Sequence, residues 1–297
     1  MEILNAKRKS AINVPTRVRF APYTVLRRLI LYVTVISFSL LFAAPLIWMI
    51  STSLKTDPQV YHVPPIWIPN PIRLANYPEA LSIRPFGIFT LNTLRYALTS
   101  TVGAVMSAAV VAYGFSRLQW PGRNVLFFLC LATMMIPFQV RMVPLYITFK
   151  NLDWLNSYKP LIIPAFLGIP YYIFLLRQFF LTIPQELSDA ARVDGANELN
   201  ILLRIILPLA KPALAVVGLL QFMAAWDNFL GPLIYLSNES LFPIALGLRQ
   251  LRSDSVEALM WPYMMAASTM TILPVVVLFF FVQRTFVEGI SITGIKG

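Results

Sequence analysis

The chain has 297 residues, of which 58% are apolar and only 12% charged, and its mean hydropathy is +0.69. A soluble domain of ordinary composition carries about 25% charged residues, so this composition indicates an integral membrane protein and excludes a soluble globular one. The net charge of +11 does not indicate a nucleic-acid partner, because such binding needs basic residues interleaved with aromatics on a soluble face.

Six stretches with little or no charge are long enough to cross a bilayer, which takes about 20 apolar residues. They are Leu29–Leu54, Tyr96–Ser116, Asn124–Val140, Pro160–Leu176, Ala213–Leu236 and Ala258–Gln283. The first is far longer than the apolar core of a signal peptide, about 7–15 residues, so it is expected to remain as an anchor. The sequence therefore predicts an all-α membrane protein with six transmembrane helices.

Lysine and arginine predict the orientation, because they are enriched in cytoplasmic segments. Seven of them precede the first span: Lys7, Arg8, Lys9, Arg17, Arg19, Arg27 and Arg28. Six spans place both termini on the same side of the membrane. We therefore expect both termini and Gly195 to be cytoplasmic, in the inner membrane of a prokaryote, with Pro64 and Asp254 outside.

Composition divides the chain into four parts. A basic cytoplasmic tail, 1–28, precedes an anchor helix with a proline-rich extracytoplasmic loop, 29–90, which is expected to be irregular. A five-helix transmembrane core, 91–284, and a cytoplasmic tail, 285–297, follow.

Two spans inside the core carry special packing signals. Ala104, Ala108 and Ala112 fall at every fourth residue of the second span, a spacing that lets helix backbones approach closely. Pro137 and Pro144 are expected to interrupt the third span, which lipid tolerates only where protein or a water-filled cavity satisfies the freed backbone.

The fifth span contains the acidic residue Asp227 within "QFMAAWDNFLGPLIYL", with a helix break expected at Gly231–Pro232. An acid inside the membrane is a functional-site hypothesis by default. The alternative is that Asp227 caps or pins the helix break. The candidates for a polar substrate pathway are Gln221, Trp226, Asp227 and Asn228.

The stretch "LSDAARVDGANELNILLRIILPLAKP", residues 187–212, is charged although apolar spans flank it. Thr182 and Gln185 have the spacing of a capping box at the start of a helix. This helix is expected to end at Asp194–Gly195, where glycine can adopt the left-handed cap. A second helix is expected from Asn197, with one apolar stripe formed by Leu199, Leu202, Ile205 and Ile206.

Two interpretations of this hairpin differ in what it contacts. A helix lying on the bilayer surface favours basic residues on its polar face, but here acids outnumber bases: Glu186, Asp189, Asp194 and Glu198 against Arg192, Arg204 and Lys211. The small pair Ala190–Ala191 would let another surface approach. The composition therefore favours a protein partner.

The same stretch resembles the EAA loop of binding-protein-dependent ABC importer permeases, the element that docks into the ATPase subunit. The residues on the motif positions are Asp189, Ala190, Ala191, Asp194, Gly195, Ala196, Ile205, Leu207 and Pro208. Two positions depart from the pattern: Asp189 replaces the usual Glu, and Leu202 stands where Phe is common. The segments "AYGFSRLQWPGR", "IFLLRQFFLTIP", "WDNFLGPLIYL" and "FVEGISITGIKG" resemble the maltose-type, carbohydrate-uptake branch and extend the likeness over nearly the whole chain.

This resemblance implies a type I ABC importer permease fold with a cytoplasmic helix–Gly–helix coupling element at 184–212. It also implies the partners: a second homologous permease subunit, two copies of an ABC ATPase and an extracytoplasmic solute-binding protein that delivers a sugar. The C-terminal tail would reach into the ATPase dimer. The residues expected to dock the ATPase are Glu186, Asp189, Ala190, Ala191, Arg192, Asp194, Gly195, Ala196, Leu202 and Pro208.

Within that set, Asp189 and Arg192 are expected to meet complementary charges on the ATPase, and Leu202 to enter an apolar pocket there. The pathway candidates Gln221, Asp227 and Asn228 are expected to face a polar cavity at the surface that pairs with the second permease.

No cofactor is expected on this chain, and ATP and Mg²⁺ would be bound by the ATPase. The segment "GISITGIK" departs from the phosphate-binding loop pattern, and no helix follows it. An ion-coupled secondary transporter and a membrane enzyme are weaker alternatives, because the first leaves the hairpin unexplained and the second needs a catalytic set. A glycerol-phosphate-type solute remains an alternative to a sugar.

Overall fold

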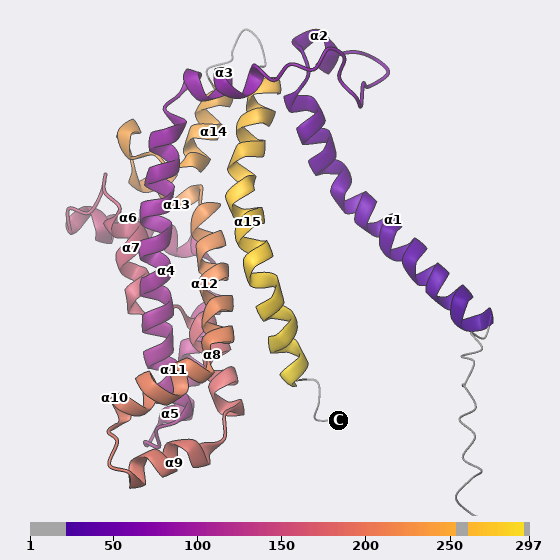
Figure 1. The fold of residues 1–297 in the computed structure, drawn as a ribbon. Helices are drawn as coiled ribbons and strands as arrows, with labels where there is room; N and C mark the ends of the chain where they lie inside the picture. Colours follow the sequence, from indigo (N-terminus) through magenta and orange to yellow (C-terminus); the bar gives the residue numbers. More distant parts are fainter. Residues whose placement is uncertain (1–21, 254–260, 294–297) are drawn as a thin grey trace, which may run out of the picture. The chain divides into compact units, whose positions relative to one another are not determined.

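The computed structural model describes residues 22–253 and 261–293, where every regular element is helical (Figure 1). The elements in chain order are α1 Pro22–Ser53, α2 Asp57–Val60, α3 Asn76–Ile83, α4 Phe86–Ser116, α5 Arg123–Ala132, η2 Thr133–Met135, α6 Phe138–Asn151, α7 Lys159–Ile162, η3 Ile163–Leu167, α8 Pro170–Thr182, α9 Gln185–Val193, α10 Glu198–Ile201, the π-helical turn η4 Leu202–Ile206, α11 Leu207–Leu209, α12 Lys211–Trp226, α13 Leu230–Tyr235, η5 Glu239–Leu241, α14 Ile244–Ser253 and α15 Trp261–Thr293. The chain divides into two compact units, residues 1–48 and 49–297, and the second holds every element after α1.

The helices account for the six predicted spans. Four are long and apolar enough to cross a membrane without a break: Leu26–Ser53, Phe86–Ser116, Lys159–Thr182 and Trp261–Phe281. Two more are bent pairs, Arg123–Met135 with Phe138–Asn151 and Glu198–Leu209 with Lys211–Trp226. Counting each bent pair as one span, the described residues give up to six spans, the number that the charge-free runs predict, although the second pair includes Glu198–Leu209, which precedes the predicted fifth span Ala213–Leu236.

Helix α4 is the element against which α8, α12 and η3 pack. The small residues predicted to permit close approach do so, since Ala104, Ala108 and Ala112 are fully buried. The Ser107 hydroxyl also donates a hydrogen bond to the carbonyl oxygen of Ala165, at 2.9 Å. Backbone proximity of this kind is what small side chains at four-residue spacing make possible in a membrane.

The third span breaks at one of the two expected prolines. The α5–η2 and α6 segments differ in direction by 97° across Pro137, whereas Pro144 lies inside α6. The expected break at Pro144 is therefore wrong. A proline removes one backbone hydrogen bond of the helix, but α6 continues past Pro144 to Asn151.

The fifth span breaks earlier than expected. Helix α12 ends at Trp226 and Asp227 is its C-terminal cap, while Gly231 and Pro232 are buried inside α13. The expected break at Gly231–Pro232 is therefore wrong, because proline is tolerated in the first turn of a helix. The Asn228 side chain stabilises that turn by accepting a hydrogen bond from the Gly231 amide at 3.1 Å.

The loop after the first span is more ordered than its proline content predicts. It contains the short helices α2 and α3, and α4 begins at Phe86 rather than near Tyr96. The buried Asn76 amide donates to the carbonyl oxygens of Ser53 and Lys55, at 2.8 Å each. Such buried amide bonds satisfy backbone groups that no helix pairs.

We expect Gly247→Ala to destabilise the protein, because a Cβ at Gly247 of α14 would lie 2.4 Å from the Phe89 ring. Phe89 is fully buried, and forcing extra volume into a packed site costs about 1–3 kcal/mol. Thermal unfolding of the purified protein should therefore occur at a lower temperature. Gly114→Ala on α4 is the matched control, since no atom lies within 4 Å of a Cβ there. Equal unfolding temperatures for the two variants would contradict this packing.

Candidate functional site

The hairpin at 184–212 lies at one end of the second unit, opposite α3 and α14 (Figure 1). Helix α9 ends at Val193, and Gly195 adopts a φ of +83°, a left-handed conformation that most side chains disfavour. Asn197 caps α10, its side-chain oxygen accepting a hydrogen bond from the Asn200 amide at 2.8 Å. The glycine turn and the start of the second helix are thus where the sequence predicts them.

The start of α9 differs from the expected capping box. Pro184 is the N-cap residue and makes no side-chain cap. The Thr182 hydroxyl instead donates to the carbonyl oxygen of Phe179, at 2.7 Å. The capping-box prediction is wrong because α8 continues through Thr182, whose hydroxyl is used within that helix.

The second helix of the hairpin changes from α-helical to π-helical at Leu202. Ile201 and Ile206 are fully buried and Leu202 nearly so, whereas Leu199 is exposed. The predicted stripe is therefore wrong at Leu199, which lies on the exposed side of α10, whereas Ile201 of the same helix is on the buried side. Ile201 and Ile206 lie five residues apart and are both buried. A regular α-helix would instead place residues three or four apart on one side.

Arg117 fixes the start of the hairpin to the end of α4. This arginine is buried and donates to the side-chain oxygen of Gln185 at 2.9 Å, to the carbonyl of Ile183 at 2.6 Å and to the carbonyl of Phe180. Burial lowers the pKa of the Arg117 guanidinium, and charge-assisted hydrogen bonds offset the cost of burying it. The α8–α9 turn is thereby attached to α4.

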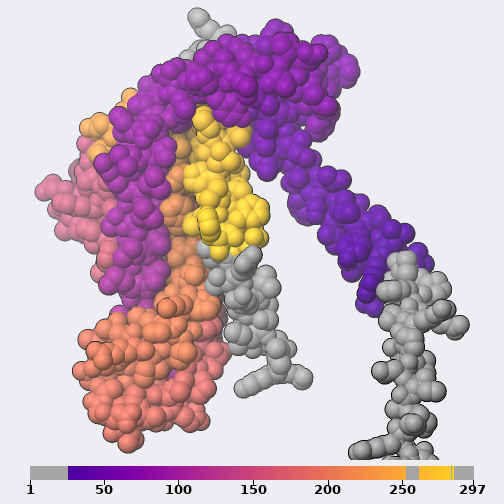
Figure 2. Space-filling model, in the orientation of Figure 1, coloured from indigo at the N-terminus to yellow at the C-terminus, as the bar shows by residue number. Residues whose placement is uncertain are grey.

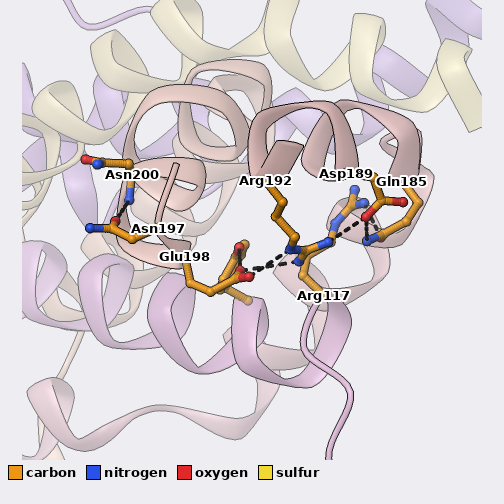
Figure 3. Close-up of polar contacts among 8 residues, drawn as sticks. Arg117, Gln185, Asp189, Arg192, Asn197, Glu198 and Asn200 are labelled. Atoms are coloured by element: carbon orange, nitrogen blue, oxygen red, sulfur yellow. Dashed lines mark hydrogen bonds and ion pairs between the residues drawn. The ribbon is translucent and has the colours of Figure 1, made fainter. Parts of the chain in front are cut away.

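Hydrogen bonds to the Glu198 carboxylate join the two helices of the hairpin to each other (Figure 3). Glu198 accepts hydrogen bonds from Arg192 at 2.8 Å and from the Tyr113 hydroxyl of α4 at 2.5 Å. Arg192 also pairs with Asp189 at 2.6 Å. Within this chain Asp189 and Arg192 therefore pair with each other, and Arg192 also binds Glu198 of α10, while the expectation that they meet charges on the ATPase stays a prediction.

The docking candidates divide into anchoring and outward-facing residues. Leu202 is only 4% exposed and packs in the chain's own core with Ala191, so the expectation that it enters a partner's pocket is not supported. The outward-facing candidates are Glu186, Asp189, Ala190, Asp194, Gly195 and Pro208. Sequence reasoning missed Val193, which is 88% exposed. The space-filling view shows the hairpin as a continuous surface at this end of the unit (Figure 2).

The pathway candidates fall into two groups, those that line a cavity and those that do not. Asp227 and Asn228 line a cavity of about 660 Å³ at the α12–α13 break. Gln221 does not line it and approaches the Ser100 hydroxyl of α4 instead, at 3.4 Å. Trp226 is fully buried, and its indole donates to the Thr271 carbonyl of α15 at 3.2 Å. Gln221 and Trp226 therefore do not line this cavity, since both side chains contact neighbouring helices instead.

Other residues of the cavity come from distant parts of the chain. Arg141 and Phe149 of α6 and Tyr235 of α13 line it. The sequence does not single these residues out, since their proximity depends on the bend at Pro137. Among residues 22–253 and 261–293, no three His, Cys, Asp or Glu side chains gather as a metal site.

We expect Arg117→Lys to loosen the hairpin, since an ammonium cannot reproduce the fork that holds Phe180, Ile183 and Gln185. Hydrogen bonds to a charged group contribute about 1.5–3 kcal/mol each, so amide hydrogen exchange across α9 should become about tenfold faster or more. Arg204→Lys, at an exposed position of the same hairpin, is the control. Unchanged exchange across α9 in Arg117→Lys would show that Arg117 does not hold the hairpin.

Comparisons with known proteins identify the family. The family described as "Binding-protein-dependent transport system inner membrane component" matches residues 100–292. The chain is 34% identical to the sulfoquinovosyl glycerol transport system permease protein SmoH of Agrobacterium fabrum, over 85% of this chain and 88% of that protein. It is 31% identical to the arabinooligosaccharides transport system permease protein AraQ of Bacillus subtilis, over 94% and 99%. It is 34% identical to the sn-glycerol-3-phosphate transport system permease protein UgpE of Yersinia pestis, over 84% and 91%.

A solved structure shares the fold. A chain of a bacterial ABC transporter involved in the import of the acidic polysaccharide alginate superimposes with a TM-score of 0.78 at 26% identity, covering 89% of this chain and 98% of that one. The candidate spans, the hairpin at 184–212 and these relatives all indicate the same family. The chain belongs to the family of inner membrane components of binding-protein-dependent transport systems, and it is an ABC importer permease subunit rather than an enzyme.

Proposed function

We propose that this chain forms half of the translocation pathway of an ATP-driven importer for a sugar. The other half is a second homologous permease subunit, two copies of an ABC ATPase bind ATP and Mg²⁺, and an extracytoplasmic solute-binding protein delivers the solute. The observation that carries the proposal is the helix–Gly–helix hairpin, held rigidly at one end of a membrane-spanning unit. Relatives named for sulfoquinovosyl glycerol and arabinooligosaccharides support a saccharide as the solute.

A glycerol-phosphate-type solute is the second candidate. It is favoured by the 34% identity to a permease named for sn-glycerol-3-phosphate, which equals the identity to the sulfoquinovosyl glycerol permease. Overall likeness therefore does not separate the two solute classes, and the residues of the pathway itself must do so. An ion-coupled secondary transporter is disfavoured, because it has no use for an ATPase-docking hairpin.

The sidedness of the protein follows from charge and from the second unit. The hairpin and the segment that contains α3 lie at opposite ends of this unit (Figure 1). The basic N-terminal tail favours a cytoplasmic N-terminus, which makes the hairpin and the C-terminus cytoplasmic and the 55–85 segment extracytoplasmic. Residues 1–21 and 294–297 of the predicted tails, and Asp254, lie outside the described residues, whereas residues 22–28 belong to α1 and 285–293 to α15.

The ATPase contact is proposed to centre on the tip of the hairpin. Val193 is the apolar side chain that would enter the partner's surface, with the acids Glu186, Asp189 and Asp194 exposed beside it. Gly195 and Ala196 form the turn. Arg192, Leu202 and Ala191 hold the tip of the hairpin to the chain's own core.

We expect Val193→Asp to abolish co-purification of the ATPase and ATP-driven uptake, because a charge would be buried in an apolar contact. The fold should tolerate the change, since this side chain is 88% exposed. Ile68→Asp is the matched control, an apolar side chain 83% exposed in the segment between α2 and α3. Full ATPase retention in Val193→Asp, with uptake at the level of Ile68→Asp, would exclude the hairpin tip as the contact.

A further inference from the structure

We propose that the α4–α5 turn and the adjoining part of α8 bind the phosphate headgroup of an anionic phospholipid, with the guanidinium groups of Arg123 and Arg177 as its ligands. This site is separate from the cavity at the α12–α13 break and from the hairpin tip, and its ligand comes from the membrane. Three observations carry it: two arginines fixed on one turn of backbone, their lack of a carboxylate partner among the described residues, and the exposed apolar surface beside them.

The two guanidinium groups bind neighbouring carbonyl oxygens where α4 ends. Arg177 of α8 donates through Nε to the carbonyl of Phe115 at 3.1 Å. Arg123, the first residue of α5, donates to the carbonyl of Leu118 at 2.8 Å. Both side chains are thus held on the same short stretch of backbone. Their charges are close enough to repel each other, and an anion bound beside both would offset that repulsion.

Aromatic packing holds the Arg177 side chain in place. Its guanidinium lies over the Phe127 ring of α5, 4.1 Å from the ring centroid. Phe127 in turn packs against Phe115 of α4, with the ring centroids 5.4 Å apart. Because Phe115 also accepts the Arg177 hydrogen bond, three helices together fix the direction of this side chain. A guanidinium held in this way loses little side-chain entropy when it binds a phosphate.

Most hydrogen-bond donors of the two arginines remain available. Both terminal nitrogens of Arg177, and Nε and Nη2 of Arg123, donate to no acceptor among the described residues. Neither arginine forms an ion pair within that part of the chain, whereas Arg73 and Arg192 each bind a carboxylate. Guanidinium N–H groups match the oxygens of a phosphate in geometry and charge. The unused donors therefore suit a phosphate from outside the chain.

The position of the pair in the chain matches the headgroup level of a bilayer. Arg123 directly precedes the charge-free run Asn124–Val140, and Arg177 directly follows the run Pro160–Leu176. Trp120 lies in the turn between α4 and α5, and tryptophan is enriched where the membrane meets water. The two guanidinium groups are therefore placed where the apolar spans end, at the hairpin end of the unit.

The surroundings of the pair favour a phospholipid over free phosphate. Val125, Phe128 and Leu129 of α5 are exposed apolar residues, along which acyl chains can pack while the headgroup stays at the arginines. The stretches 114–127 and 170–182, which build the site, contain no Asp or Glu that would repel a phosphate. Basic pockets between transmembrane helices bind anionic lipid headgroups. Free phosphate would use the arginines and leave the apolar surface uncovered.

The test maps lipid contacts in the complete complex. The permease pair with its ATPase is placed in phosphatidylcholine nanodiscs that contain a rising fraction of phosphatidylglycerol with a photoreactive diazirine in its acyl chain. Mass spectrometry of the peptides after illumination identifies the labelled residues. Residues 124–132 of α5 should be labelled saturably by this lipid and far less by photoreactive phosphatidylcholine. An excess of inorganic phosphate should leave the labelling unchanged.

Variants separate a defined site from a general attraction to the membrane. Arg123→Gln and Arg177→Gln should each raise the phosphatidylglycerol fraction needed for half-maximal labelling about fivefold, with the ATPase still bound. Arg123→Lys, which keeps the charge, should stay close to the wild type. Arg204→Gln is the matched control, since it removes one exposed charge from the hairpin.

Four results would overturn the proposal. The first is equal labelling of α5 by the two lipids. The second is loss of labelling with inorganic phosphate, which would show a site for a free anion. The third is no labelling of α5 in the complete complex, as a covering protein subunit would produce. The fourth is half-maximal labelling in Arg123→Gln and Arg177→Gln at the same fraction as in Arg204→Gln.

Discussion

The Arg117 guanidinium at the end of α4 is the interaction on which the hairpin depends. It binds two carbonyl groups at the end of α8 and the first side chain of α9, where backbone groups would otherwise remain unpaired. Removing one partner of a buried charge network costs several kcal/mol, more than any surface pair contributes. The α8–α9 turn is therefore a fixed extension of α4, and the hairpin can transmit a displacement rather than absorb it.

The hairpin and the cavity are joined by a single helix. Helix α12 begins at Lys211, directly after the hairpin, and its C-terminal cap is Asp227 at the cavity. At a rise of about 1.5 Å per residue, its 16 residues cover roughly 24 Å. The π-helical turn before it buries Leu202 and Ile206. The path from the hairpin to the cavity therefore consists of α12 and the 81° bend between Glu198–Leu209 and Lys211–Trp226.

The features that could be predicted from the sequence are local ones. Spans, the Gly195 turn and the alanine stripe of α4 depend on neighbouring residues, so composition and spacing suffice. Arg117 could not be predicted, because its partner Phe180 lies 63 residues away in the chain. The resemblance to the EAA loop places Leu202 in a pocket of the partner, whereas this side chain is only 4% exposed and packs in the chain's own core, a long-range contact that the motif does not encode. Of the pathway candidates, Asp227 and Asn228 reach the cavity, whereas Trp226 one residue earlier turns towards α15.

The central claim is that the hairpin presents its tip to the ATPase and keeps Leu202 for its own core. Photo-crosslinking in native membranes tests it most directly, with benzoylphenylalanine placed at position 193 in one variant and at 202 in another. We expect an adduct with the ATPase from position 193, and an internal adduct or none from position 202. An ATPase adduct from position 202 in the absence of one from position 193 would contradict the account.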